Sequence, residues 1–457
     1  MTTTRTSQSV LIVTVAAALA GAIFPGSNGI AGDSSAPPDS VAPALADSPE
    51  VSENLVDAMA LSDVSLGGFL FPHLHAFGVF GDSTADDIDS LASGHHDPQR
   101  EATLQSLEPS VSLRAGMLEG FATASGHTDA HGTFDFGLEE GFLKLVDLPL
   151  GIELRGGQFY NRFGFQNALH NHSWMLVDQN LVNGRFLQEG EMAILGGEAT
   201  IDVPLSMMQV SAISVAVGGL PSHEHDHEHE HGEEAEFEAE GANFAGTLVT
   251  ANWVNQYDIN DMNRLTSTLS GAWGDNMFGR ETQIYGLGFE YLWRENGYGA
   301  GGQSLRWRNE LMYRHFGAVS GELHEHGHEE EDHDHEHEEI GHEDEHGHHE
   351  DEDHEEEDHE HEDRYRASLD EFGLYSTLVY GFNDTWETGV RAGWVSGIDE
   401  VGLDDRFRLS PMVTWYANPT RNLLARIQYN WDHSDEFGDE HSIWFQVGMT
   451  FGGPEVR

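Results

Sequence analysis

Hydrophobic and polar residues alternate along much of the chain from about residue 63 onward, in short segments separated by polar breaks. In residues 422–431, for example, Leu423, Ile427 and Tyr429 fall on one side, whereas Arg426 and Gln428 fall on the other. Successive side chains of a β-strand point to opposite faces. Such segments are therefore predicted to be strands with one apolar and one polar face.

About sixteen segments of this kind can be recognised, and together they predict an all-β chain. They lie near residues 63–81, 102–115, 117–126, 132–146, 151–160, 191–203, 207–220, 243–256, 265–274, 281–294, 303–316, 364–382, 386–397, 406–417, 422–433 and 441–452.

The connections between these segments alternate in length. Every long connection, including 82–101, 161–190, 221–242 and 318–363, is odd-numbered, and the even-numbered connections are all short. Transmembrane β-barrels show this asymmetry, with short periplasmic turns, long outer loops and an even number of strands. A soluble β-sandwich or propeller does not predict it. The expected fold is an antiparallel transmembrane β-barrel of about 16 strands around a water-filled lumen.

The two ends of the chain differ from this pattern. Residues 1–31 combine Arg5, an apolar run and a small-residue cleavage motif, and they are predicted to be a secretory signal peptide. Residues 32–62 are expected to be a flexible periplasmic segment, followed by the barrel over 63–452 and a tail over 453–457. An aromatic residue at the end of the last strand, here Phe451, resembles the C-terminal signature of outer-membrane barrels. The six residues that follow it depart from that signature.

Charge and composition narrow the possible partners. The formal net charge of −59 disfavours nucleic acid, which needs a basic face, and favours cations. The chain has no cysteine, so disulfides, thiolate metal sites and iron–sulfur clusters are excluded. A transition metal would have to be bound by histidine and carboxylate ligands.

Two tracts rich in histidine and acidic residues fall within two of the long connections. They contain 5 and 13 of the 29 histidines, which argues against a mere acidic spacer, the alternative reading. With little apolar content they are expected to be disordered without metal, and to offer several exchanging sites on the outer side. The residues predicted to bind metal are His223, His225, His227, His229, His231, His324, His326, His328, His333, His335, His337, His342, His346, His348, His349, His354, His359 and His361.

Other candidates lie outside the tracts. His170 and His172, in the 161–190 connection, are weaker metal candidates, against the alternative of a packing pair. His73 and His75 share one face of the first predicted strand and are a still weaker lumenal candidate. Five arginines on polar strand faces are expected to line the lumen and to influence selectivity, against the alternative of an ordinary charge-balanced wall. These are Arg155, Arg306, Arg308, Arg391 and Arg426.

Residues 139–205 contain the elements "EEGFLKL", "LPLGIELRGGQFYNRFG", "LHNHSW", "VDQNLV" and "RFLQEGEMAILGGEATIDVPL". These resemble a family of bacterial outer-membrane proteins described as zinc-regulated receptors or porins, which carry histidine-rich outer loops. The resemblance implies exchangeable zinc, whereas the ligand types alone fit copper and nickel as well. The receptor label would imply a TonB-dependent transporter. This chain departs from that label, because it has neither room for a plug domain nor a sign of 22 strands.

The resulting hypothesis is an outer-membrane porin-like channel whose surface loops capture divalent metal, with zinc as the expected ion. The alternatives are a surface metal buffer on a barrel that does not transport, and a general solute porin with accessory metal-binding loops. Motifs of the common hydrolases, phosphate loops and metalloproteases are missing, so neither enzymatic activity nor an organic cofactor is expected. The expected partners are membrane lipid, metal ions and the barrel-assembly machinery. Homo-oligomerisation is left open.

Overall fold

The computed structural model describes residues 69–452 and Glu455, with gaps at 86–87, 89–90, 95, 129–132, 188–189, 222–238, 300, 320–365, 399–402 and 453–454. The predicted signal peptide and the periplasmic segment fall outside the described residues. So do both histidine-rich tracts.

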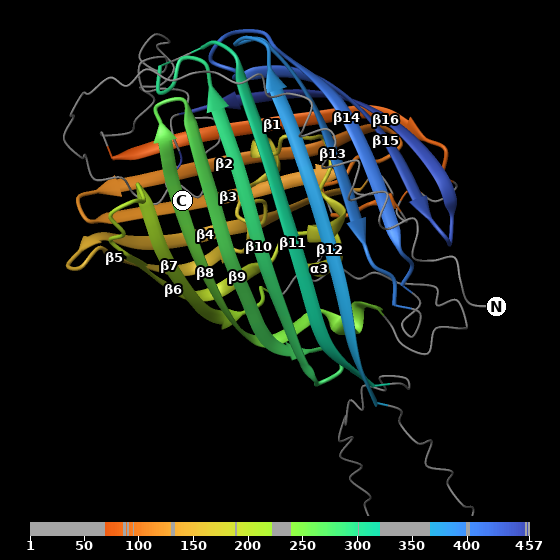
Figure 1. Cartoon of the computed structure of the whole chain (residues 1–457), viewed down its shortest axis with the longest axis horizontal. Coiled ribbons are helices and arrows are strands. Elements are labelled where there is room, and N and C mark those ends of the chain that lie inside the picture. Colours follow the sequence, from red (N-terminus) through yellow and green to blue (C-terminus); the bar gives the residue numbers. More distant parts are fainter. Residues whose placement is uncertain are drawn as a thin grey trace, which may run out of the picture.

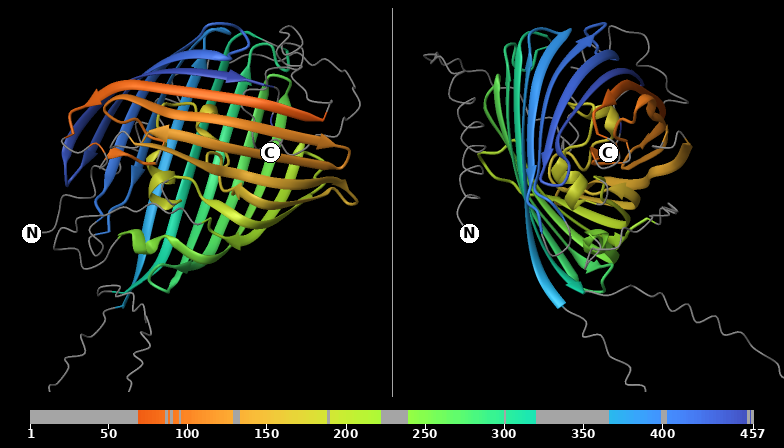
Figure 2. Two further views of the ribbon diagram at one scale, coloured as in Figure 1. Left: turned by 180° about the vertical axis from the view of Figure 1, so that it is seen from behind. Right: turned by 90° about the vertical axis from the view of Figure 1, so that its right-hand side faces the viewer.

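Sixteen antiparallel strands form one closed barrel, in which each strand pairs with its neighbours in the chain and β1 pairs with β16 (Figures 1 and 2). The strands are β1 Leu70–Ser83, β2 Glu101–Ala115, β3 Leu118–Thr128, β4 Phe134–Leu148, β5 Ile152–Tyr160, β6 Ala193–Asp202, β7 Val210–Gly219, β8 Phe244–Asn260, β9 Asn263–Asn276, β10 Glu281–Arg294, β11 Ser304–Val319, β12 Arg366–Gly381, β13 Trp386–Val395, β14 Arg406–Tyr416, β15 Leu423–Ser434 and β16 Gly438–Phe451. The predicted strand number and fold class are confirmed, and each predicted segment coincides with one strand to within a few residues at most ends. Residues 63–68, where the first predicted segment begins, lie outside the described residues.

The barrel wall is apolar outside and polar inside. Leu143, Leu195, Leu269 and Leu287 on the outer face are 55–56% exposed, whereas Gln428 on the inner face is fully buried. A water-soluble protein would bury the leucines, so this inverted arrangement is suited to a hydrocarbon environment. Closure also leaves no sheet edge unpaired, as a lipid environment requires. The architecture, with short turns at one end and long loops at the other, is that of a transmembrane β-barrel.

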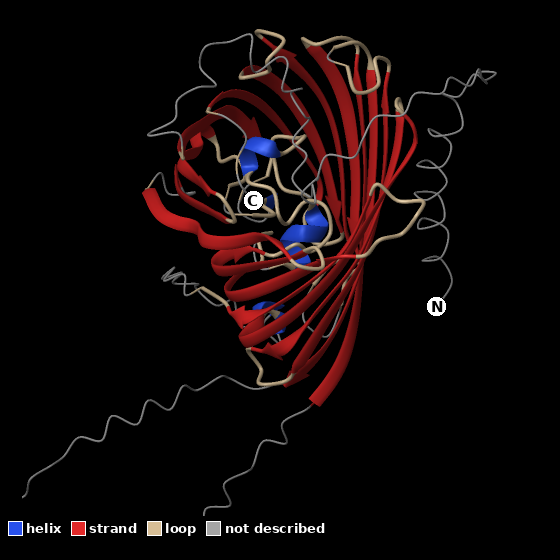
Figure 3. Ribbon diagram, turned by 90° about the vertical axis from the view of Figure 1, so that its left-hand side faces the viewer, coloured by secondary structure: helices blue, strands red, loops and turns tan. Residues whose placement is uncertain are grey.

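Short helical elements lie in the loops, and the longest of those described is α3 Leu181–Phe186. None of the helices among the described residues has the length and apolarity needed to cross a membrane. The 3₁₀ helix η2 Asn171–Ser173 and α3 both belong to the β5–β6 connection. Figure 3 shows helices and loop segments inside the ring of strands. A second 3₁₀ helix, η3 Ala239–Ala242, precedes β8.

Gly157 marks a close approach between β4 and β5. Its φ of 137° suits glycine alone, and a Cβ there would lie 2.2 Å from the Gly141 carbonyl oxygen. We therefore expect Gly157→Ala to lower the unfolding free energy by about 1–3 kcal/mol. The measurement is urea unfolding of the refolded barrel, with Gly137→Ala in β4 as the control because its Cβ would enter open space. Equal midpoints for the two variants would contradict this expectation.

Candidate metal centre in the lumen

Residues 161–192 are called here the inner loop. Their described part leaves the wall after β5 and crosses the barrel interior before β6 begins, as the yellow segment in Figure 2 shows. Near its start, the backbone N–H of Gly164 donates to Ser270 Oγ on β9 at 3.0 Å. Further along, the N–H of Val177 donates to Gln428 Oε1 on β15 at 2.7 Å. The inner loop is thus attached to two distant parts of the wall, and it narrows the lumen.

Asp178 is the main attachment of the inner loop to the wall formed by β13–β15. Its carboxylate accepts hydrogen bonds from Arg391 at 2.6 Å, Arg408 at 2.9 Å, Gln428 at 2.6 Å and Asn430 at 2.9 Å. Burial alone would raise the pKa of Asp178, but the Arg391 and Arg408 guanidinium groups outweigh it and lower the pKa. The aspartate therefore stays charged within a buried, fully polar contact.

The opposite side of the inner loop meets a cluster of histidines and glutamates. His170 is buried, with Nδ1 2.7 Å from Glu139 and Nε2 2.8 Å from Glu140, both on β4. Its Nδ1 also lies 3.9 Å from Glu108 on β2. Both ring nitrogens of one histidine therefore face carboxylates, which is a strongly cation-attracting environment.

The loop between β1 and β2 adds a second histidine to this cluster. His96 is buried, and its Nε2 lies 2.9 Å from Glu139 Oε1. Glu191, at the end of the inner loop, accepts a hydrogen bond from the Tyr160 hydroxyl at 2.5 Å. Glu139 therefore stands between two histidines that come from different loops.

Two overlapping sets of residues could hold a metal ion around Glu139. In each set the ligand atoms lie within 4.8 Å of one another. One set is His96, Glu139 and Glu191, and the other is Glu108, Glu139 and His170. Imidazole nitrogen and carboxylate oxygen are the ligands of zinc and similar ions when thiols are absent. Glu108 Oε1 is buried without a hydrogen-bond partner among the described residues, which leaves a ligand atom available. The residues present therefore fit a divalent metal.

The electrostatics around His96 show how acidic this part of the lumen is. Burial alone would lower the pKa of His96, but the hydrogen bond with Glu139 and the charges of Glu191 and Glu139 raise it to about 9. Burial, together with the charge of Glu139, raises the pKa of Glu191 to about 7, although the charge of His96 opposes this. The surroundings thus stabilise a positive charge at this place.

A β-bulge explains why two consecutive residues, Glu139 and Glu140, both reach this cluster. In the β3–β4 pairing, Thr123 faces Glu140 and Ala124 faces Leu138, so Glu139 is the extra residue. A similar shift in the β1–β2 pairing leaves Gln105 as the extra residue, and its carbonyl lies 3.1 Å from His96 Nδ1. Bulges re-aim side chains in this way next to functional sites.

The sequence-predicted candidates are distributed as follows. The eighteen tract histidines lie outside the described residues. His170 and His172 both lie in the lumen, on the inner loop. The His75 ring stacks on the His172 ring. His73, on the same strand, has its Nε2 3.0 Å from Ser112 Oγ and is outside the candidate metal sets.

The five predicted arginines lie on the inner face of the wall, each beside an acid or a carbonyl group. Arg155 donates to Glu198 at 2.9 Å and packs 4.1 Å from the Phe159 ring centroid. The others are Arg306, 3.8 Å from Glu290; Arg308, 2.7 Å from Glu290; Arg391, bonded to Asp178; and Arg426, which donates to the Leu176 carbonyl at 2.9 Å.

Sequence reasoning missed most of the acidic members of the cluster. Glu108 lies on the polar face of its strand, so alternation alone could have marked it as lumenal. Glu139 could not be found in this way, because the bulge breaks the alternation. His96, Glu191 and Glu455 lie outside the strands, and only the folded chain brings them together.

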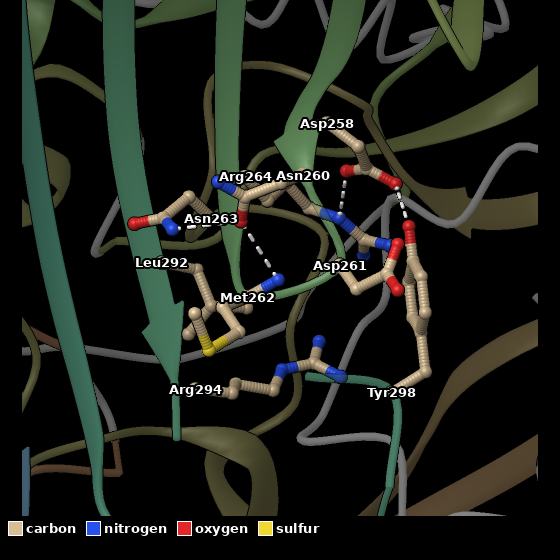
Figure 4. Close-up of a pocket in the computed structure, with 9 residues that line it drawn as sticks. All are labelled: Asp258, Asn260, Asp261, Met262, Asn263, Arg264, Leu292, Arg294 and Tyr298. Atoms are coloured by element: carbon tan, nitrogen blue, oxygen red, sulfur yellow. Dashed lines mark hydrogen bonds and ion pairs between the residues drawn. The ribbon is translucent and has the colours of Figure 1, made fainter. Parts of the chain in front are cut away.

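A separate shallow pocket lies at the short-turn end, between the β8–β9 and β10–β11 turns (Figure 4). Its polar groups mostly bond to one another. Arg264 donates to Asp258 at 2.8 Å, and the Tyr298 hydroxyl donates to the other oxygen of the same carboxylate. Burial and the hydrogen bond to Asp258 raise the pKa of Tyr298 to about 12. This network holds two turns together and is not a metal-ligand set.

Among known proteins, only solved structures resemble this chain. No family model matches it, and no curated protein matches it. Among solved structures it is similar to an anion-selective porin from Comamonas acidovorans, with a TM-score of 0.43 and 9% identity over 84% of this chain and 98% of that one. It is also similar to the outer-membrane channel DcaP of Acinetobacter baumannii (TM-score 0.45, 8% identity, 84% and 96% covered). A third is OprD of Pseudomonas aeruginosa (TM-score 0.41, 10% identity, 84% and 95% covered). None of these names mentions zinc or a TonB-dependent receptor, and the resemblance of residues 139–205 to the zinc-regulated family stays an expectation.

Proposed function

We propose that this chain is a porin-like channel of a bacterial outer membrane that conducts divalent transition metal ions, with zinc as the expected ion. The observation that carries the proposal is the pair of overlapping ligand sets around Glu139, which lie inside the barrel and beside the inner loop. An ion that crosses the lumen on this side would meet histidine and carboxylate ligands while still inside the protein wall.

The shared ligand supports transfer rather than permanent storage. Because Glu139 belongs to both sets, an ion can move from one set to the other by exchanging the remaining ligands. The carboxylates of Glu108, Glu139, Glu140 and Glu191 lower the energy of a divalent ion at this place in the narrowed lumen. Conduction requires binding that is favourable enough for entry and weak enough for release, and a ligand shared between adjacent sites favours exchange over permanent retention.

The histidine-rich tracts complete the proposed pathway. They belong to long connections at the same end of the barrel, and we propose that this end faces the outside and gathers metal before it enters the lumen. The ion is the transported substrate and exchanges freely. The proposal includes neither a catalytic activity nor an organic cofactor, and it keeps membrane lipid and the barrel-assembly machinery as partners.

The inner loop supports a second candidate, a surface metal buffer on a barrel that does not conduct. This loop is bonded to β9 on one side and to β15 on the other, which would suit a closed lumen. The two candidates differ in one measurable property, since only the channel requires an ionic current.

The experiment is single-channel recording of the refolded protein in planar bilayers while zinc is titrated at pH 7.5. Open channels whose current changes with zinc, together with zinc entry into liposomes loaded with a zinc-sensitive dye, are the expected result. Magnesium serves as the matched control ion, because it prefers all-oxygen coordination and retains its water. A silent bilayer at every zinc concentration would support the buffer instead.

A further inference from the structure

Glu455 lies four residues beyond Phe451, the last residue of β16, yet its side chain is inside the barrel. Its carboxylate is 3.1 Å from Nε2 of His75 on β1 and 3.8 Å from Nε2 of His172 on the inner loop. The side chain is 12% exposed. A segment beyond the sheet thus contributes a carboxylate to the same lumen that holds the Glu139 cluster.

The two histidine rings are aligned to share one ligand. Their centroids are 3.7 Å apart and their planes differ by 6°. Parallel stacking brings both Nε2 atoms to the Glu455 carboxylate, and the three ligand atoms lie within 4.8 Å of one another. Tetrahedral zinc with bonds of about 2.0–2.1 Å places its ligand atoms about 3.3 Å apart. The distance from Glu455 Oε1 to His75 Nε2, 3.1 Å, and the distance from Glu455 Oε2 to His172 Nε2, 3.8 Å, lie on either side of that value.

Glu108 contacts the ring nitrogen of His172 that faces away from Glu455. Its Oε2 lies 2.5 Å from Nδ1 of His172, which leaves Nε2 of that ring for an ion. A carboxylate on the far nitrogen orients a metal-binding histidine and increases its basicity. Glu108 also belongs to the ligand set that contains His170. The His75–His172–Glu455 set and the sets around Glu139 are therefore neighbours in the lumen.

We infer that His75, His172 and Glu455 form a metal site that fastens the C-terminal segment to β1 and to the inner loop. This goes beyond the proposed passage of ions, because the site joins three separate segments and would do so whether or not the barrel conducts. Two imidazoles and one carboxylate leave a fourth position for water, and they select a transition metal such as zinc over magnesium or calcium.

The absence of cysteine allows a direct test in the full-length protein. Val456→Cys provides a single attachment point for a nitroxide spin label next to Glu455. We expect zinc at pH 7.5 to slow the motion of the label, as seen in the electron paramagnetic resonance spectrum, and a chelator to reverse this. Metal bound by the histidine-rich tracts does not interfere, since the label reports only on the C-terminal segment.

Two variants decide the outcome. Glu455→Gln in the labelled protein should raise the zinc concentration that gives half of the slowing by at least tenfold. His172→Ala, which removes the ligand on the inner loop, should have the same effect. Glu436→Gln, a change at an exposed glutamate in the β15–β16 turn, should leave the zinc response unchanged. A spectrum that is the same with zinc and with chelator, or an unaltered response of Glu455→Gln, would overturn the inference.

Zinc entry into liposomes, measured on the same preparations, separates this inference from the proposed function. Slowing of the label without zinc entry supports the site and counts against the channel. Zinc entry without slowing of the label supports the channel and counts against the site.

Discussion

Asp178→Ala is expected to loosen the contact between the inner loop and the β13–β15 wall and to increase the single-channel conductance. The carboxylate accepts four hydrogen bonds, two of them from the buried guanidinium groups of Arg391 and Arg408. Its removal leaves the Arg391 guanidinium without its carboxylate partner, whereas Arg408 keeps Asp432 at 2.8 Å. Breaking a buried ion pair in this way costs about 3–5 kcal/mol. We therefore also expect a lower urea midpoint for unfolding of the barrel.

Conductance in planar bilayers and urea unfolding of the refolded barrel measure the two effects. Asp435→Ala removes an exposed aspartate from the β15–β16 turn and should change neither quantity. A variant that unfolds earlier but keeps the wild-type conductance would show that the inner loop does not limit the current. A variant with unchanged unfolding would contradict the ion-pair argument itself.

Glu139→Gln is expected to abolish most of the metal response of the lumen, because Glu139 is the only member common to both ligand sets around it. The amide keeps the shape of the side chain but removes the negative charge and weakens coordination. Loss of an outer-shell partner already lowers metal affinity by roughly 10–100-fold, and the loss of a direct ligand should exceed this. Half-maximal change of the current should therefore need at least 100-fold more zinc.

The tract histidines would obscure this effect, so the measurement uses a background in which all eighteen are replaced by asparagine. Zinc should still alter the current in that background, and Glu139→Gln should raise the zinc concentration at half-effect by at least 100-fold. Glu153→Gln is the matched control, because this glutamate lies outside the three candidate metal sets. If the background protein no longer responds to zinc at all, the metal sensitivity belongs to the tracts and not to the lumen.

The strands of this barrel could be predicted almost completely from local pattern. Alternation separates Ile427 and Tyr429, which face outward, from Arg426 and Gln428, which face inward, and it does so within a few residues of chain. The pattern is strong because the two faces contact such different surroundings, lipid on one side and the polar interior on the other.

The candidate metal centre could be predicted only in part. His170 and His172 were identifiable because a closely spaced histidine pair in a long connection is a local signal. Glu139 was hidden by a bulge that reverses the alternation at one residue. His96 and Glu191 join the cluster through contacts between segments far apart in the chain, which no local pattern reports. The arginines could be assigned to polar strand faces from the alternation, but their acidic partners could be identified only after the strands had been aligned.

The pairing of β1 with β16 determines when the protein can finish folding. This seam joins Leu74 to Phe451, residues 377 positions apart (451 − 74), and extends to Ser83 and Ser442. Every other pairing of strands joins neighbours in the chain and can form earlier. Contacts between such distant residues carry the largest loop-closure cost and slow folding. Until the final strand arrives, β1 presents an open edge, and an unfinished chain is exposed to pairing with other chains.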